Sequence, residues 1–294
     1  MVSLDSHIEA LDSSISRDFE PRSRFRSLDL CIGGWPSRLW VDSERLLDEA
    51  AEKYAAFLST ESPVFQMIVT ETEFGEQEQF AQTIESASVD SRHYIFRWDF
   101  GIRVDLAANV THAHLHYGSG GSLDSILRIS HALYAVMHQG VLFHSASIRL
   151  GDRAIALVGG TGCGKSALSE RLGVTVFSDE LTVIRERDDG MWLYGTPFHG
   201  QFAEFTNDQA PVSMIVALRE TDADPPVDGP TAAIRFLMKH AFFFGDATST
   251  SELLLTHITR IVQGVPVRSF LLDESLRSKE GSQLREVILE LSQS

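Results

Sequence analysis

The clearest chemical signal in the sequence is an eight-residue segment near the middle of the chain. Gly159–Ser166 has the pattern Gly-x-x-x-x-Gly-Lys-Ser. An apolar run at 154–158 predicts a buried strand before it, and residues 165–172 predict a helix after it, which is the context of a phosphate-binding loop. Glycines let successive backbone N–H groups face one concavity, and the helix start adds the positive end of its dipole. The pattern predicts binding of a nucleoside triphosphate, expected to be ATP.

Two side chains in this loop have defined chemical roles. Lys165 can reach the β- and γ-phosphates, and the Ser166 hydroxyl can bind Mg²⁺. Cys163 fills a variable position, where a small residue that simply fits is the plainer interpretation and a redox-sensitive thiol is the alternative. The predicted nucleotide-binding residues are Gly159, Gly160, Thr161, Gly162, Cys163, Gly164, Lys165 and Ser166.

Two adjacent carboxylates follow the loop and its helix. Asp179 and Glu180 come directly after a short apolar strand predicted at 174–177. In an open α/β sheet, reactive groups gather beyond the carboxyl ends of strands. A carboxylate in that place can hold Mg²⁺ or accept the proton of an attacking hydroxyl. The alternative interpretation is a solvated acidic turn.

Other polar residues are weaker candidates. His112, His114 and His116 alternate along one predicted strand and share a face, which could hold a metal. A polar strand face is the favoured interpretation, because no nearby carboxylate or cysteine completes a ligand set. His199 in a loop and Arg219 at a strand end could contact substrate, or could be ordinary surface residues.

Composition and charge exclude several classes of protein. The chain has 294 residues and a formal net charge of −16, from 41 acidic and 25 basic side chains. We expect no nucleic-acid partner, because such binding needs a basic patch and no Lys/Arg cluster is evident. We also expect no disulfide framework or metal motif from two distant cysteines. The acidic N-terminus and the lack of a long apolar run predict no signal peptide and no membrane partner, hence a cytoplasmic protein.

The remaining patterns predict two domains. The first 20 residues are polar and predicted to be mobile, strands are expected within 25–41 and 64–70, and a helix is expected at 42–58. Alternating residues at 94–104 and 112–116 predict a β-meander. The run Gly-Ser-Gly-Gly at 118–121 suggests a boundary, giving an α+β domain at 1–118 that could recognise the acceptor or a partner. Residues 119–294 alternate strands and helices, as α/β domains do.

Three segments together resemble the kinase domain of HPr kinase/phosphorylase, a bacterial protein-serine kinase, and its shorter relatives. They are the strand segment 142–148, in which His144 lies upstream of the loop, the loop segment 159–172, and the Phe-Ser-Asp-Glu segment at 177–180. A weaker likeness links residues 194–200, Tyr-Gly-Thr-Pro-Phe-His-Gly, to a loop of related kinases encoded with peptide-modification systems. These segments cover a minor part of the chain.

The resemblance implies an α/β P-loop kinase domain of the HPr kinase/PEP carboxykinase type at 119–294, preceded by a smaller α+β domain. It implies that Asp179 is the catalytic base and that Lys165 also serves catalysis. Ser166, Glu180 and Asp179 would hold Mg²⁺. His144 would orient the acidic pair, or it is a buried histidine bonded to backbone. A homo-oligomer is compatible with the likeness.

The sequence therefore predicts an ATP- and Mg²⁺-dependent kinase that phosphorylates a hydroxyl of a protein, peptide or small molecule. Residues 195–200 lack the acidic residue and the Arg–Gly stretch expected of the bifunctional enzymes, so phosphorylase activity is not predicted and HPr is not implied as acceptor. Two alternatives stay open: a non-catalytic ATP sensor and an NTPase whose acceptor is water. ATP rather than GTP is an expectation only, because the loop binds phosphates and not the base.

Overall fold

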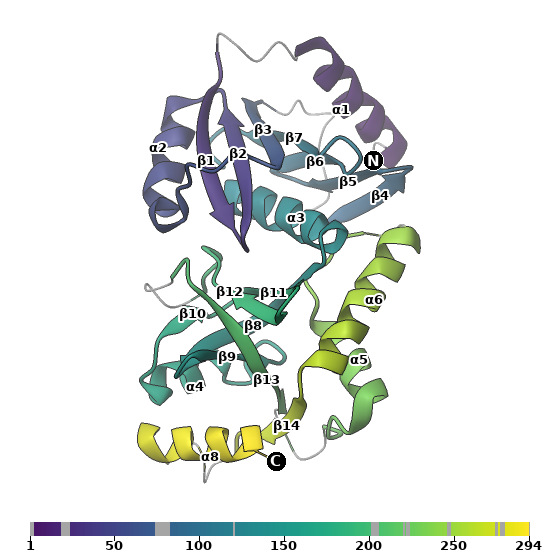
Figure 1. Cartoon of the computed structure of the whole chain (residues 1–294). Helices are drawn as coiled ribbons and strands as arrows, with labels where there is room; N and C mark the ends of the chain where they lie inside the picture. The colour runs from purple at the N-terminus through teal and green to yellow at the C-terminus, as the bar shows by residue number, and fades with distance from the viewer. Residues whose placement is uncertain are drawn as a thin grey trace. The chain divides into compact units, whose positions relative to one another are not determined.

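The computed structural model describes residues 3–18, 24–73, 83–119, 121–200, 206–219, 221, 224–245, 248–273, 276 and 280–293. Two compact units divide the chain (Figure 1). Unit 1 contains Met1–Met137 and Phe243–Ser251, and unit 2 contains His138–Phe242 and Glu252–Ser294. Among the described residues, each unit is built on a seven-stranded mixed sheet.

The division differs from the predicted boundary at 118/119. Helix α3 (Ser122–Met137) packs on strands β6 (Phe100–Asp105) and β7 (Val110–His116), so it belongs to unit 1. The run at 118–121 lies within unit 1 and does not separate two units. The two units are consequently of nearly equal size.

The sheet of unit 1 combines a parallel centre with antiparallel edges. Its order is β1-β2-β3-β7-β6-β5-β4, with β2–β3 and β3–β7 parallel and the other pairs antiparallel. The long alternation predicted over 94–104 is a hairpin that turns at 98–99. The remaining elements are β1 (Arg26–Ile32), β2 (Trp35–Val41), α2 (Glu44–Lys53), β3 (Phe65–Thr72), β4 (Glu85–Val89) and β5 (Arg92–Arg97).

The predicted mobile N-terminus is wrong, because residues 4–18 form helix α1 (Leu4–Asp18). Leu11 and Ile15 are buried against Tyr94 and Phe96 of β5. The apolar residues of this segment recur at helical spacing, but the polar residues between them conceal the pattern. The helix therefore depends on a tertiary contact that composition does not reveal.

Helices cover both faces of this sheet (Figure 1). On the face opposite α1, Phe65 of β3 stacks on Tyr134 of α3, with ring centroids 4.2 Å apart. Helix α2 is joined to α3 on that same face, where the Tyr54 hydroxyl donates to Asp124 Oδ1 at 3.0 Å. Unit 1 is thus a closed three-layer arrangement.

The sheet of unit 2 has a parallel edge formed by β9, β13 and β14. Along the main path its order is β10-β8-β11-β12-β13-β14, and β9 pairs with β8 and β13. Strand β14 was not predicted, because its five residues carry polar side chains at two positions. The strands are β8 (Gly140–Leu150), β9 (Arg153–Val158), β10 (Val176–Ser178), β11 (Leu181–Arg187), β12 (Gly190–Tyr194), β13 (Gln209–Arg219) and β14 (Val267–Leu271).

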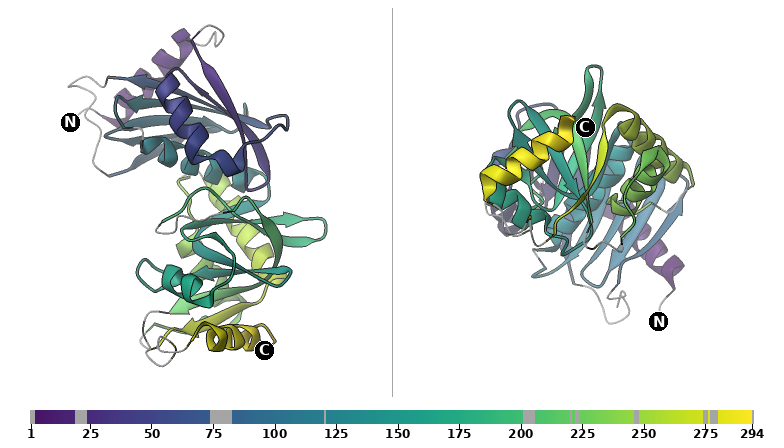
Figure 2. Two further views of the ribbon diagram at one scale, coloured as in Figure 1. Left: turned by 90° about the vertical axis from the view of Figure 1, so that its left-hand side faces the viewer. Right: turned by 90° about the horizontal axis from the view of Figure 1, so that it is seen from below.

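Helices also lie on both sides of this parallel edge. Helices α4 (Lys165–Leu172) and α8 (Gly281–Gln293) pack together on one face, α8 being the yellow helix of Figure 2. Leu168 and Leu284 join that core. Helix α5 (Gly229–His240) packs its Ala233 against Ala217 on the other face, and α6 (Thr248–Gly264) contributes Val262 there. None of the described helices is both long and apolar enough to cross a membrane.

Candidate functional site

The glycine-rich turn lies between a strand and a helix, as its sequence predicts. Strand β9 ends at Val158 and α4 begins at Lys165. Gly164, the N-cap residue, has φ of 96°, a left-handed conformation that favours glycine. A Cβ on Gly159 would lie 2.6 Å from Cys163 Sγ. Gly164 is therefore favoured by its backbone conformation and Gly159 by the close approach of Cys163, which is buried and forms part of the fold of the loop.

The ammonium group of Lys165 contacts the backbone of the glycine-rich turn. Its side chain is 6% exposed, and Nζ donates to Gly159 O at 2.9 Å and to Gly160 O at 2.8 Å. Burial lowers the pKa of Lys165, while the charges of Cys163 and Glu180 act in the opposite direction. The ammonium group of Lys165 is thus largely desolvated, and the negative charge of Glu180 stabilises its protonated form.

The start of α4 is open to an anion. No side chain caps it, and its first turn contains no acidic residue. Gly160, Thr161 and Gly162 of the turn are exposed. Ser166 is half-buried in the first helical turn. These features fit a phosphate group, because the positive end of a helix is joined there by a lysine.

The sheet brings the acidic pair to the same edge as the loop. Strands β9 and β10 are both antiparallel to β8, so they run in the same direction. Ser145 of β8 pairs with Val158 on one side, and its N–H donates to Glu180 O at 3.0 Å on the other. Two strand spacings therefore separate the backbones of the loop and the acidic pair, about 10 Å.

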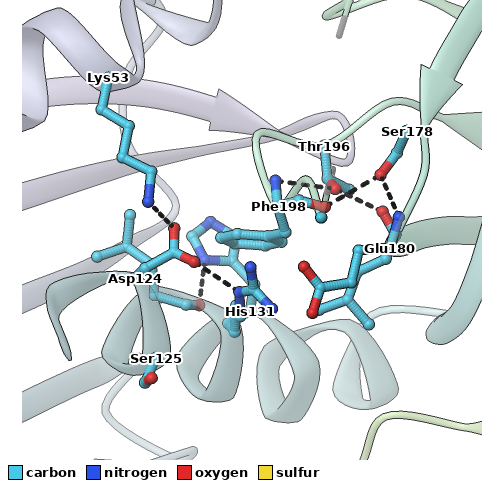
Figure 3. A network of polar contacts seen from close by, with 12 residues as sticks. Lys53, Asp124, Ser125, His131, Ser178, Glu180, Thr196 and Phe198 are labelled. Atoms are coloured by element: carbon cyan, nitrogen blue, oxygen red, sulfur yellow. Dashed lines mark hydrogen bonds and ion pairs between the residues drawn. The ribbon is translucent and has the colours of Figure 1, made fainter. Parts of the chain in front are cut away.

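Residues 196–200 form a hydrogen-bonded wall around this acidic turn (Figure 3). The Ser178 hydroxyl donates to Phe198 O at 3.1 Å, and Glu180 N–H donates to Ser178 Oγ at 3.4 Å. The Thr196 hydroxyl donates to Leu181 O at 2.5 Å. Residues 196–200 belong to the segment that weakly resembles a kinase loop. Their hydrogen bonds hold the backbone on either side of Asp179 and Glu180.

The same wall holds the Asp179 carboxylate directly. Asp179 is 4% exposed, and its Oδ1 accepts a hydrogen bond from Gly200 N–H at 2.7 Å. A Cβ on Gly200 would lie 3.2 Å from Asp179 Oδ2, so a larger residue would push the carboxylate. Sequence reasoning identified Asp179 but not this support, since nothing local couples two residues 21 positions apart.

The structure places the other predicted residues at different distances from this edge. His144 of β8 pairs with Leu181 and is half-buried, so its backbone lies beside the acidic pair. His199 lies within the 196–200 wall, half-buried, and its N–H donates to Pro197 O at 3.2 Å. Arg219 ends β13, which is parallel to β9, and therefore lies next to the loop.

The histidines of β7 lie in unit 1 and form no metal site with described residues. No group of three or more described His, Cys, Asp or Glu side chains is placed to hold a metal. His114 Nε2 lies 3.2 Å from Ser14 Oγ of α1, and His116 Nδ1 lies 3.0 Å from Tyr117 O. Burial lowers the pKa of His112 to about 4. The contacts of His114 and His116 are with a hydroxyl and a backbone carbonyl.

A pocket of about 500 Å³ in unit 2 adjoins the loop. One wall comes from the loop, one from the end of β13 and the turn after it, and one from α5. Sequence reasoning missed the α5 wall, although two basic residues four positions apart, Arg235 and Lys239, were a usable signal. The lining residues are Gly160, Cys163, Leu218, Arg219, Asp224, Pro225, Pro226, Val227, Ala232, Arg235, Phe236, Lys239 and His240.

No protein-family model matches this chain, and no curated protein matches it. Among solved structures, the HPr(Ser) kinase/phosphatase from Coxiella burnetii shows a likeness at 14% sequence identity. That likeness covers 29% of this chain and 69% of the other, with a TM-score of 0.24. A score this low supports neither a shared fold nor a shared function. The family resemblance read from the sequence therefore stays a prediction.

Proposed function

We propose that this protein is a kinase that transfers the γ-phosphoryl group of ATP to a hydroxyl group. One observation carries the proposal: the buried ammonium of Lys165 lies in a loop open to anions, and strand β8 joins the end of β9, just before that loop, to the acidic turn that contains Glu180. A phosphate-binding cation and a pair of carboxylates at one sheet edge are the groups that phosphoryl transfer requires. The resemblance to HPr kinase-like proteins agrees with this assignment.

The reaction assigns one task to each residue. The Asp179 carboxylate accepts the proton of the acceptor hydroxyl as its oxygen attacks the γ-phosphorus. The bond from that phosphorus to the β,γ-bridging oxygen breaks, and ADP leaves with the electron pair. Lys165 and the loop N–H groups stabilise the charge that builds on the phosphate oxygens. The products are a phosphate ester, ADP and one proton.

The residues present fit Mg²⁺ without a preformed cage. Mg²⁺ takes few protein ligands and keeps waters and phosphate oxygens. Ser166 Oγ and the carboxylates of Glu180 and Asp179 would hold it. When bound, the ion neutralises phosphate charge.

Transfer of label from γ-labelled ATP tests the proposal. Wild-type protein would be incubated with Mg²⁺ and a cell extract as the source of acceptors, beside Lys165→Ala and Asp179→Asn. Glu170→Gln, an exposed substitution on α4, serves as the matched control. We expect label in an extract component with wild type and Glu170→Gln, and with neither of the other variants.

The other two functions give different results in the same experiment. Steady phosphate release without any acceptor, lost in Asp179→Asn, would establish an NTPase. ATP bound by wild type with neither hydrolysis nor transfer would establish a nucleotide sensor. Equal labelling by wild type and Asp179→Asn would refute the role given to Asp179.

A further inference from the structure

The pocket beside the loop has the dimensions and walls of a small-molecule site. Its volume of about 500 Å³ lies within the usual range for such ligands. Leu218, Val227 and Phe236 supply apolar surface. The pocket is formed entirely within unit 2. None of the reactions described above uses its α5 wall.

The charge of this pocket is opposite to that of the chain. Arg219, Arg235 and Lys239 line it together with one carboxylate, in a chain of net charge −16. That carboxylate, Asp224, closes a local turn, because its Oδ2 accepts from Thr221 N–H at 2.9 Å.

Two of the cations are available to a ligand. Arg235 and Lys239 are one helical turn apart and exposed, and neither forms an ion pair or side-chain hydrogen bond with another described residue. Cations concentrated in a concave site, within an otherwise acidic protein, favour an anionic ligand.

The pocket opens at the reactive end of the phosphate loop. Gly160 lines it, and the carbonyl of Gly160 is the group that accepts from Lys165 Nζ at 2.8 Å. His240, which also lines it, donates from Nδ1–H to Phe236 O at 2.8 Å. Burial lowers the pKa of His240, and the charges of Lys239 and Lys165 lower it further. Lys165, the lysine expected to contact the β- and γ-phosphates, is therefore hydrogen-bonded to a residue of the pocket lining.

We propose that this pocket binds the phosphate acceptor, and that the acceptor is a small hydroxyl compound with a phosphate or carboxylate group held by Arg235 and Lys239. The inference rests on the proposed kinase function. It adds that the acceptor enters from the α5 side, so that the anionic group is anchored on α5 while the hydroxyl points to the γ-phosphate. The transfer step is the one described under the proposed function, and it leaves the phosphate or carboxylate group of the acceptor unchanged.

Probe binding to the nucleotide-loaded protein tests this assignment. Affinities for phenyl phosphate, benzoate and the neutral benzyl alcohol would be measured by saturation-transfer NMR, with the protein saturated by a non-hydrolysable ATP analogue and Mg²⁺. The variant is Arg235→Gln/Lys239→Gln. The control is Arg26→Gln/Arg153→Gln, which removes two exposed cations elsewhere. Affinity for the nucleotide analogue would be measured separately for each protein by calorimetry.

We expect wild type and control to bind phenyl phosphate or benzoate, and benzyl alcohol much more weakly. The Arg235→Gln/Lys239→Gln variant should bind the anionic probe at least about tenfold more weakly, because charge-assisted hydrogen bonds are lost, with nucleotide affinity unchanged. Preference for one anionic probe would say whether the group is a phosphate or a carboxylate. If the double variant does not fold, each single variant carries the test, with about a threefold loss expected.

Several results would overturn the inference while leaving the kinase proposal intact. These are anion affinity equal in wild type and variant, benzyl alcohol binding as tight as the anions, or an anionic probe that binds the nucleotide-free protein but not the protein saturated with the analogue. The last would assign the pocket to the nucleotide itself. A wild-type protein that binds no nucleotide would refute the kinase proposal, and anion binding in that protein would leave an anion pocket without an acceptor role.

Discussion

Each unit contains a strand that turns directly into a helix, and the two turns differ in what they leave open. In unit 1, β2 leads into α2 through Asp42 and Ser43. Ser43 Oγ accepts from Leu46 N–H at 3.4 Å, and Asp42 Oδ1 accepts from Glu71 N–H at 3.0 Å. Glu44 adds a carboxylate to the first turn. The chain itself satisfies this helix start, so the turn serves the fold.

In unit 2, β9 leads into α4 through six residues that provide no such cap. The N-cap is Gly164, and the first turn carries the cation Lys165 in place of an acid. The N–H groups that a capping side chain would occupy are left for another acceptor. The comparison shows that the start of a helix becomes a candidate anion-binding site when no side chain of the protein caps its N–H groups and a cation lies beside them.

The largest test of this contrast is Lys165→Ala. We expect affinity for a nucleoside triphosphate to fall at least about 100-fold, because a desolvated charge on the phosphates is lost. Calorimetric titration with ATP and Mg²⁺ measures this. Unchanged affinity would mean that the open turn of α4 is not the nucleotide site.

A second prediction concerns the stability of unit 1 and its dependence on pH. Burial lowers the pKa of His131 in α3 to about 4, and its Nδ1 lies 2.8 Å from Leu127 O. Because the unfolded state takes up a proton near pH 6.5 and the folded state does not, stability is complete above that pH and falls toward pH 4. We expect a loss of about 2 kcal/mol in the free energy of unfolding from this residue.

Urea unfolding at pH 7 and pH 4.5 measures the loss. His131→Gln should remove that part of the pH dependence, whereas the control His116→Gln at the end of β7 should retain it. The same pH dependence in wild type and His131→Gln would contradict the assignment.

Gly200→Ala should affect transfer without affecting nucleotide binding. The added Cβ would press on Asp179 Oδ2, 3.2 Å away, and shift the proposed base. We expect the rate of phosphoryl transfer to fall about tenfold, since catalysis depends closely on position. Single-turnover labelling gives the rate and calorimetry the affinity. Gly121→Ala, where a Cβ meets nothing within 4 Å, is the control.

The smallest expected effect is that of Ser43→Ala. Loss of the cap on α2 should lower the free energy of unfolding by about 1 kcal/mol. Nucleotide affinity should stay at the wild-type value, as urea unfolding and ATP titration together would show. A drop in nucleotide affinity would contradict the assignment of the α2 turn to the fold alone.

The sequence predicted those elements whose signals are local. The helix at 165–172 was predicted with the bounds that the structure has, because the glycine-rich turn marks its start and Gly173 its end. Helix α1 was missed because its few apolar residues become informative only against Tyr94 and Phe96. The domain boundary was misplaced because glycines mark a turn equally well inside a unit.

The candidate site divides in the same way. Residue types and spacing alone indicated the phosphate loop and the acidic pair, since the chemistry of each lies in one short segment. Their convergence depends on β8, which pairs with β9 on one side and with β10 and β11 on the other. The Gly200 hydrogen bond to Asp179 and the α5 wall of the pocket also come from distant segments. Long-range pairing decides which side chains meet, and no local pattern encodes it.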